Sequence, residues 1–481
     1  MRAALAILAL IVAGWALWTL EGARAGIEIE TFPDGPTPIT RYSDGSDGPV
    51  VVVAHGFAGS QQMMQGYSLL LAQAGYTVFA FDFEGHGRHV LPMSGDVNAI
   101  DGTTRLLVDQ TRSVIETVRQ GEAPVTLLGH SMATDILVRT AAETPGIGAM
   151  VLLSAFSLAI DEGHPENLLL ITGAWEPGLR DFALEAAQMV DPGATYGAAV
   201  TSGTVTRKAV LAPASEHVSI LHSRAGRAEA LDWINTFHGK DSAPAVPQTG
   251  WALLALLAAI TALAYPLSAL LPRQEGAAEP LRPTAFAAVT LVPMIAAPLL
   301  AAPVETGFIP VLVADYLALH LFLYGAVQIG LLWRLGAGLP APSVGAVLAL
   351  GIYGIAVFGL ALDRYGANFW PVGDRPWIIA ALALGAVPFM LGDAWAAQAA
   401  PLWQRVLARI GFLASLGIAV ALDFEGLFFL LMIAPVIVLF WLTFGLMGRA
   451  VARRAGAASA GIALGLVLAW ALGVSFPLFQ A

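Results

Sequence analysis

The segment from Gly129 to Ala133 has the composition of a turn that exposes a nucleophilic serine, Ser131. Such a strand-to-helix turn needs small residues around the serine, so that its hydroxyl can stand exposed at the end of a sheet. Alone the pattern is weak, because a chain rich in glycine and alanine produces similar matches by chance. Here an apolar run precedes the turn and a helical pattern follows it, which makes Ser131 a strong candidate nucleophile.

A serine hydroxyl becomes a good nucleophile when a histidine takes its proton and an acid holds that histidine in place. In one fold class these partners follow the serine in the order acid, then histidine. Glu176 comes after the predicted strand 167–172, and His217 comes after the last predicted strand. Asp181 and His222 are the alternatives for acid and base, although each lies deeper in the helix that follows its strand.

The oxyanion formed by attack on a carbonyl group needs two backbone N–H donors. Met132, directly after the serine, is expected to supply one, and Phe57, in the loop after an early predicted strand, the other. We predict no metal site, since the chain has no cysteine and His89 and His164 show no ligand partners at metal spacing. We also predict no cofactor, and we expect His86 to brace a glycine-rich turn.

Short apolar or β-branched runs alternate with helical patterns around these residues. Predicted strands are 50–54, 77–83, 125–129, 149–154, 167–172 and 208–212, and predicted helices are 61–73, 103–119, 132–143, 177–189 and 218–237. This alternation indicates a doubly wound α/β fold with a mostly parallel sheet. Ligands of such sheets bind at the carboxyl ends of the strands, where the candidate residues stand.

Residues 45–240 resemble the α/β-hydrolase superfamily, in its serine esterase or lipase-like branch. The resemblance rests on the His55-Gly56 loop, the turn from Asp82 to Gly87, the serine turn, and the late acid and histidine. It implies Ser131 as nucleophile, His217 as base and Glu176 as acid. The departures are Ala133 in place of a glycine, a glutamate where aspartate is commoner, and no inserted cap between Ser154 and Asn167, which implies an open site.

The composition of the whole chain indicates a membrane protein: 57% of its 481 residues are hydrophobic and 12% are charged. Residues 26–245 carry 25 Asp and Glu against 12 Lys and Arg, whereas residues 246–481 carry 9 against 10. An acidic, soluble-looking domain therefore precedes a nearly uncharged one. Nucleic acid is not an expected partner, because no basic patch could neutralise its phosphates.

The predicted domains are an anchor or signal peptide at 1–25, a hydrolase domain at 26–240, a linker at 241–248 and a bundle of about eight transmembrane helices at 249–481. The apolar run 3–20 can cross a ~30 Å hydrocarbon core. Because it is longer than a usual signal core, an uncleaved anchor is favoured, although residues 23–25 resemble a cleavage site. The other predicted spans are 249–272, 284–303, 308–333, 343–362, 377–396, 404–422, 427–447 and 458–478.

The arginines predict the orientation of these spans. Alternating the loops puts Arg273, Arg282, Arg334, Arg405, Arg409, Arg449, Arg453 and Arg454 on one side, and Arg364 and Arg375 on the other. By the positive-inside rule the first side is cytoplasmic, so the acidic domain lies outside. We therefore expect a multi-pass protein of the bacterial inner membrane with its hydrolase domain on the periplasmic side.

Ionisable residues within the predicted spans are further candidates for function. Asp315 and His320 share one span, and Asp393 lies near the end of another. Such groups are costly in a membrane and often functional, so they could line a polar cavity or a headgroup site. The alternative is a mutually satisfied polar pair, or an aspartate close enough to the interface to be hydrated.

These features favour a membrane-tethered serine hydrolase that cleaves an ester, or alternatively a thioester or amide, of a lipid or lipid-linked substrate on the outer side. The linker segment from Lys240 to Gln248 has roughly nine residues and reaches at most ~30 Å, which keeps the domain near the lipids. One alternative is an acyltransferase that uses the same three residues. Another is a transporter-like membrane protein with a non-catalytic hydrolase-like domain, although no internal repeat of the kind common in transporters is evident.

Overall fold

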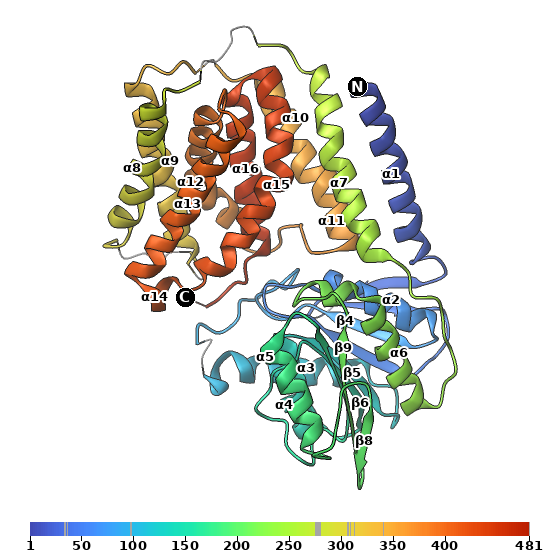
Figure 1. Cartoon of the computed structure of the whole chain (residues 1–481). Coiled ribbons are helices and arrows are strands. Elements are labelled where there is room, and N and C mark those ends of the chain that lie inside the picture. Colours follow the sequence, from blue (N-terminus) through green and yellow to red (C-terminus); the bar gives the residue numbers. More distant parts are fainter. Residues whose placement is uncertain are drawn as a thin grey trace.

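The computed structural model describes residues 1–32, 35, 37–96, 99–274, 280–304, 307, 309–311, 313–339 and 341–480. It has two parts, a domain built on one sheet and a bundle of long helices that lies against one end of that domain (Figure 1). The predicted fold class, a mostly parallel α/β sheet together with an all-helical region, is confirmed.

The sheet has nine strands in the order β1-β2-β4-β3-β5-β6-β7-β9-β8. The central six, from β4 to β9 in this order, are parallel, whereas β1, β2 and β8 pair antiparallel. The strands are β1 (Glu28–Phe32), β2 (Ile39–Ser43), β3 (Val50–Ala54), β4 (Thr77–Phe81), β5 (Val125–His130), β6 (Ile147–Leu153), β7 (Asn167–Gly173), β8 (Ala199–Ser202) and β9 (Val205–Ala212). The sequence patterns did not predict the three antiparallel strands; β1 and β8 are mostly exposed and lack a continuous apolar run.

Helices cover both faces of this sheet, because side chains of each strand point alternately to opposite faces. In β3, Val51 and Val53 join the core beneath α2 (Gln65–Gln73) and α6 (Arg224–His238). Val50 and Val52 join the opposite core. That second core is covered by α3 (Arg105–Val118), α4 (Met132–Glu143) and α5 (Pro177–Gln188). Burial on both faces explains the uninterrupted apolar composition of the parallel strands.

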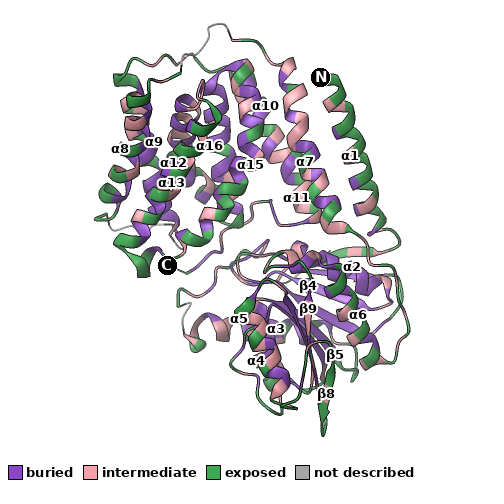
Figure 2. Cartoon of the chain, viewed as in Figure 1, coloured by how far each residue is buried: buried purple, intermediate pink, exposed green. Residues whose placement is uncertain are grey.

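Within the part of the chain that the structure describes, nine helices are long and apolar enough to cross a membrane. They are α1 (Arg2–Gly22), α7 (Thr249–Leu267, extended to Leu270), α8 (Pro283–Ala301), α9 (Ala314–Arg334), the continuous run α10 to α11 (Val344–Tyr365), α12 (Arg375–Ala396), α13 (Leu402–Leu422), α15 (Leu430–Ala455) and α16 (Ala457–Ser475). The predicted start of one span at residue 308 lies outside the described residues. In Figure 2 α16 is the most enclosed of these helices, whereas α1 and α8 expose apolar faces at the rim.

The first helix belongs to the bundle. Ala16 and Leu20 of α1 are buried in the same core as residues of α7, beside which α1 lies in Figure 1. At the carboxyl-terminal end of α1, Glu21 accepts a 2.6 Å hydrogen bond from Arg364. These contacts join α1 to the bundle, and the uncleaved anchor stays a prediction.

The bundle contacts the sheet domain directly at the carboxyl ends of β3 and β4. Arg375, a fully buried arginine at the start of α12, donates to Gly85 O of the sheet domain and to Gly473 O and Phe476 O of the bundle. Asn368 N donates to Ser60 Oγ over 3.0 Å. The position of the sheet domain on the bundle is therefore fixed by direct contacts in addition to the linker.

Candidate active site

Ser131 stands between β5 and α4 in a strained backbone conformation, with φ 53° and ψ −119°. A positive φ is unusual for a residue with a side chain and turns the serine out of the sheet. Small neighbours make the turn possible: a Cβ at Gly129 would lie 2.5 Å from Leu137 Cδ1. Ala133 is fully buried at this turn, so alanine fits where the family pattern has glycine.

His217 connects Ser131 to an acid. Its Nε2 lies 2.8 Å from Ser131 Oγ and its Nδ1 lies 2.6 Å from Glu176 Oε1. A carboxylate only accepts hydrogen bonds, so Nδ1 carries the proton and Nε2 is free to accept from the serine hydroxyl. The side chain of His217 is 44% exposed, which leaves room for a substrate beside it.

Glu176 is buried and fully hydrogen-bonded. Its Oε2 accepts hydrogen bonds from Ser154 Oγ at 2.7 Å and from Gly173 N at 2.8 Å. Burial raises the pKa of this carboxyl group, but the bonds from His217, Ser154 and Gly173 outweigh burial and lower the pKa below its ordinary value. Glu176 is therefore ionised at neutral pH and can hold His217 in the required tautomer.

The structure places the alternative acid and base outside this group. Asp181 is exposed on α5. His222 is half-buried where the sheet domain meets the bundle, and a Cβ at Gly250 of α7 would lie 2.5 Å from its Cβ. Burial and the nearby Arg227 lower the pKa of His222 to about 4. The geometry thus favours Glu176 and His217.

The loop after β3 passes directly beside the serine. A Cβ on Gly56 would lie 2.9 Å from Ser131 Cβ, so only glycine permits this approach. His55 holds the loop, because its Nε2 accepts from Phe83 N at 3.1 Å and its Nδ1 therefore donates to Gly56 O at 2.8 Å. Within the described chain, no acceptor is bonded to the N–H groups of Phe57 or Met132. Both groups therefore remain our predicted oxyanion donors.

Two positioning residues were not predicted from the sequence. Ser154 supports Glu176, and His130 Nε2 lies 2.7 Å from the backbone oxygen of His217. Burial, with a smaller effect from His217, lowers the pKa of His130 to about 4, so it is neutral and can donate to that oxygen. Ser154 directly follows β6 and His130 is the last residue of β5. Because ligands of such sheets bind at the carboxyl ends of the strands, both residues could have been predicted from their positions.

The bundle reaches the rim of this site. The ring of Phe57 packs against Phe429, which lies between α14 (Phe424–Leu427) and α15, and against Phe479 near the carboxyl terminus, with centroids 5.9 and 6.4 Å apart. The open site implied by the missing cap is thus bordered on one side by the bundle.

Exposed apolar residues also lie near the site residues in the sequence. Trp175 precedes Glu176 and is 67% exposed, and Val218 follows His217 and is also exposed. Phe156 and Leu158 lie in the loop after Ser154, with Leu158 81% exposed. Four large apolar residues are therefore exposed at positions next to or shortly after site residues in the sequence.

The ionisable residues of the bundle have separate partners. Asp315 accepts a 3.0 Å hydrogen bond from Ile309 N and lines a cavity of about 580 Å³ on the side of the sheet domain, together with Phe479. His320 Nε2 lies 3.0 Å from Ser415 Oγ in the bundle interior. His86 lies instead in the turn after β4, with its Nδ1 2.9 Å from Glu84 O, as expected of a bracing residue.

Comparisons with known proteins identify the sheet domain. Residues 46–178 match the model of the family described as serine aminopeptidase, S33. No curated protein matches the chain.

Among solved structures, a CIB-like hydrolase of Thermoplasma acidophilum is 16% identical over 44% of this chain and 98% of its own, with a TM-score of 0.35. A dienelactone hydrolase of Anabaena variabilis is 16% identical over 44% of this chain and 99% of its own, with a TM-score of 0.33. An epoxide hydrolase from an endophytic Streptomyces is 27% identical over 27% of this chain and 38% of its own, with a TM-score of 0.23. The matched residues, the strand order and the serine turn together make the sheet domain of this chain an α/β-hydrolase domain, joined to a bundle of apolar helices.

Proposed function

We propose that this protein is a membrane-tethered serine hydrolase that cleaves an ester, or alternatively a thioester or amide, of a lipid or lipid-linked substrate on the outer side of the membrane. The observation that carries the proposal is the continuous hydrogen-bonded chain from Ser131 through His217 to Glu176. All three residues lie at the carboxyl ends of parallel strands, where α/β enzymes bind their ligands.

In the proposed reaction, Ser131 Oγ attacks the carbonyl carbon while His217 Nε2 takes the hydroxyl proton. The N–H groups of Phe57 and Met132 stabilise the oxyanion of the tetrahedral intermediate. His217 then gives its proton to the leaving group, and an acyl-enzyme remains on Ser131. Water, deprotonated by His217, releases the acid and restores the serine, while Glu176 keeps the imidazole oriented throughout.

Two features favour a lipid substrate. The rim of exposed apolar residues, Phe156, Leu158, Trp175 and Val218, suits an acyl chain better than a polar substrate. The contact of Phe57 with Phe429 keeps the site next to the bundle, and therefore close to membrane lipids. A soluble substrate would give no reason for either feature.

The orientation is inferred from charge. Most of the bundle's arginines belong to helix ends and connections at the end of the bundle away from the sheet domain (Figure 1). By the positive-inside rule, that end is cytoplasmic, which puts the hydrolase domain outside, in the periplasm of a Gram-negative cell.

The substrate class can be tested with purified full-length protein in detergent micelles. Matched acyl esters of short and long chain, with the corresponding thioesters and amides, would be incubated with wild-type protein and with the Ser131→Ala variant. We expect faster hydrolysis of the long-chain esters and at least ~10³-fold loss in the variant. Full activity of the variant, or equal rates for short and long chains, would contradict the proposal. Mass analysis with glycerol present would reveal acyl transfer, the alternative reaction of the same acyl-enzyme.

A further inference from the structure

A second site lies in the bundle, at the end away from the hydrolase domain. A cavity of about 250 Å³ is lined there by four arginines, Arg405, Arg409, Arg449 and Arg453, and by a single carboxylate, Asp393. The arginines come from the first two turns of α13 and the last two turns of α15, and Asp393 lies near the end of α12. Three helices therefore bring their charged ends to one cavity.

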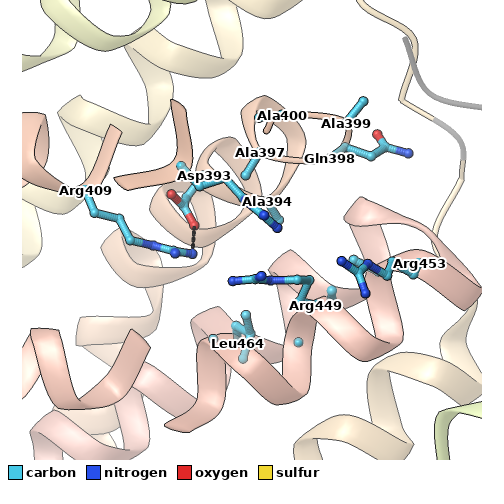
Figure 3. Close-up of a pocket in the computed structure, with 15 residues that line it drawn as sticks. Asp393, Ala394, Ala397, Gln398, Ala399, Ala400, Arg409, Arg449, Arg453 and Leu464 are labelled. Atoms are coloured by element: carbon cyan, nitrogen blue, oxygen red, sulfur yellow. Dashed lines mark ion pairs between the residues drawn. The ribbon is translucent and has the colours of Figure 1, made fainter. Parts of the chain in front are cut away.

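Among the residues that the structure describes, the lining of this cavity carries more positive than negative charge. Asp393 is buried and lies 3.6 Å from Arg409, which also stacks on Trp441 with 5.3 Å to the ring centroid. Figure 3 shows Arg409 extending toward Asp393, while Arg449 extends below it from the facing helix. The described lining thus has one carboxylate and four guanidinium groups, a surplus of three positive charges.

Two of these arginines have hydrogen-bond donors that the described chain does not use. The Nε atoms of Arg405 and Arg409 are buried and, within the described chain, have no hydrogen-bond partner. Leaving a buried charged donor unpaired is costly, so such groups are ordinarily bonded. The fork of a guanidinium group matches the oxygens of a phosphate group, which accept several such bonds at once. A phosphate-bearing ligand would satisfy both donors and neutralise the surplus charge.

An apolar groove beside the cavity indicates that the phosphate group belongs to a lipid. Arg449 and Arg453 also line the end of an apolar groove of about 700 Å³ that follows α15 from Val436. The length of helix from Val436 to Arg453 corresponds to about 26 Å, more than half of a ~30 Å hydrocarbon core. The arginine cavity alone is smaller than the ~300–1,000 Å³ of ordinary ligand pockets. Its size therefore suits a lipid headgroup whose acyl chains lie outside the cavity.

We propose that the arginine cavity and the adjoining groove bind one anionic phospholipid of the leaflet opposite the hydrolase domain. Its phosphate group lies among Arg405, Arg409, Arg449 and Arg453, and its acyl chains follow the groove along α15 and α7. This site is separate from Ser131, so it does not depend on the proposed hydrolase activity.

The test uses full-length Ser131→Ala protein in detergent micelles, so that no lipid ester is consumed. Native mass spectrometry would measure binding of dioleoylphosphatidylglycerol, of dioleoylglycerol, which lacks the phosphate, and of inorganic phosphate. We expect the phospholipid to bind at least about tenfold more tightly than either of the other two probes.

Single variants test whether binding depends on the cavity itself or only on the positive charge of this membrane face. Arg449→Gln should weaken phospholipid binding about tenfold, whereas Arg334→Gln, which removes an exposed arginine at the same end of the bundle, should leave it within twofold. Gly445→Leu should weaken binding by filling the cavity without changing its charge, and Asp393→Asn should strengthen it.

The proposal is overturned if Arg334→Gln weakens binding as much as Arg449→Gln, or if dioleoylglycerol binds as tightly as the phospholipid. Inorganic phosphate that binds as tightly as the phospholipid would assign the cavity to a soluble anion and refute a lipid site. Gel filtration profiles that match that of the Ser131→Ala parent protein would show that each variant is folded.

Discussion

Ser154 donates a 2.7 Å hydrogen bond to Glu176 Oε2, the carboxylate oxygen that does not face His217. The other oxygen, Oε1, lies 2.6 Å from His217 Nδ1. Each oxygen therefore has its own partner, and the carboxylate cannot rotate without losing one of them. Ser154, held with φ 49° at the end of β6, acts as a positioning residue for the acid.

Replacing Ser154 by alanine should slow the enzyme and shift its pH profile. The bond from Ser154 favours the ionised form of Glu176, so its loss raises the pKa of that group. Activity that is lost as Glu176 is protonated should then be lost at higher pH than in the wild type, with kcat about tenfold lower and KM little changed. Ser157→Ala is the matched control, because Ser157 Oγ donates to Asp135, outside the site. An unshifted acid limb would argue against this role.

The identity of the acid can be decided by two amide substitutions. Glu176→Gln keeps the shape of the side chain but no longer favours the proton on His217 Nδ1, so kcat should fall by about 10⁴-fold. Asp181→Asn, on an exposed position of α5, should leave kcat unchanged. Steady-state hydrolysis of one ester by both purified variants makes the comparison. A large loss in Asp181→Asn with little loss in Glu176→Gln would reverse the assignment.

The bundle is expected to support the oxyanion loop through Phe429. Removing this ring in Phe429→Ala takes away a packing partner of Phe57, so the Phe57 N–H becomes less well positioned and kcat should fall several-fold. Phe424→Ala is a suitable control, since Phe424 is exposed, belongs to the same connection and packs on Phe428 instead. Equal activity of the two variants would show that the contact is not used in catalysis.

The chain has no cysteine, which allows its orientation to be tested with single introduced thiols. Ser202→Cys, on the exposed strand β8, should react in intact spheroplasts with a maleimide that cannot cross the membrane. Gly338→Cys, in the connection between α9 and α10, should react only after the cells are opened. The reverse pattern would put the hydrolase domain in the cytoplasm.

Local rules were enough to predict Ser131, Glu176 and His217, because a nucleophile turn needs small neighbours and the order of the partners along the chain is fixed by the fold. The parallel strands were predicted for a similar reason, since burial on both faces gives them continuous apolar runs. The exposed strands β1 and β8 have no such run.

Contacts between distant segments were beyond these rules. The packing of Phe57 on Phe429 joins positions more than 350 residues apart, and the convergence of Arg409 and Arg449 depends on how α13 and α15 pack. Hydropathy and arginine counts indicate spans and their orientation, but they carry no information on which helices become neighbours.

The central claim is that His217 and Glu176 activate Ser131 as a nucleophile. Purified full-length protein would be treated with a fluorophosphonate probe, and the modified residue would be located by peptide mass spectrometry, alongside the Ser131→Ala and His217→Ala variants. We expect an adduct on Ser131 in the wild type and none at that position in either variant. A folded wild-type protein without an adduct, or undiminished labelling of Ser131 in His217→Ala, would contradict it.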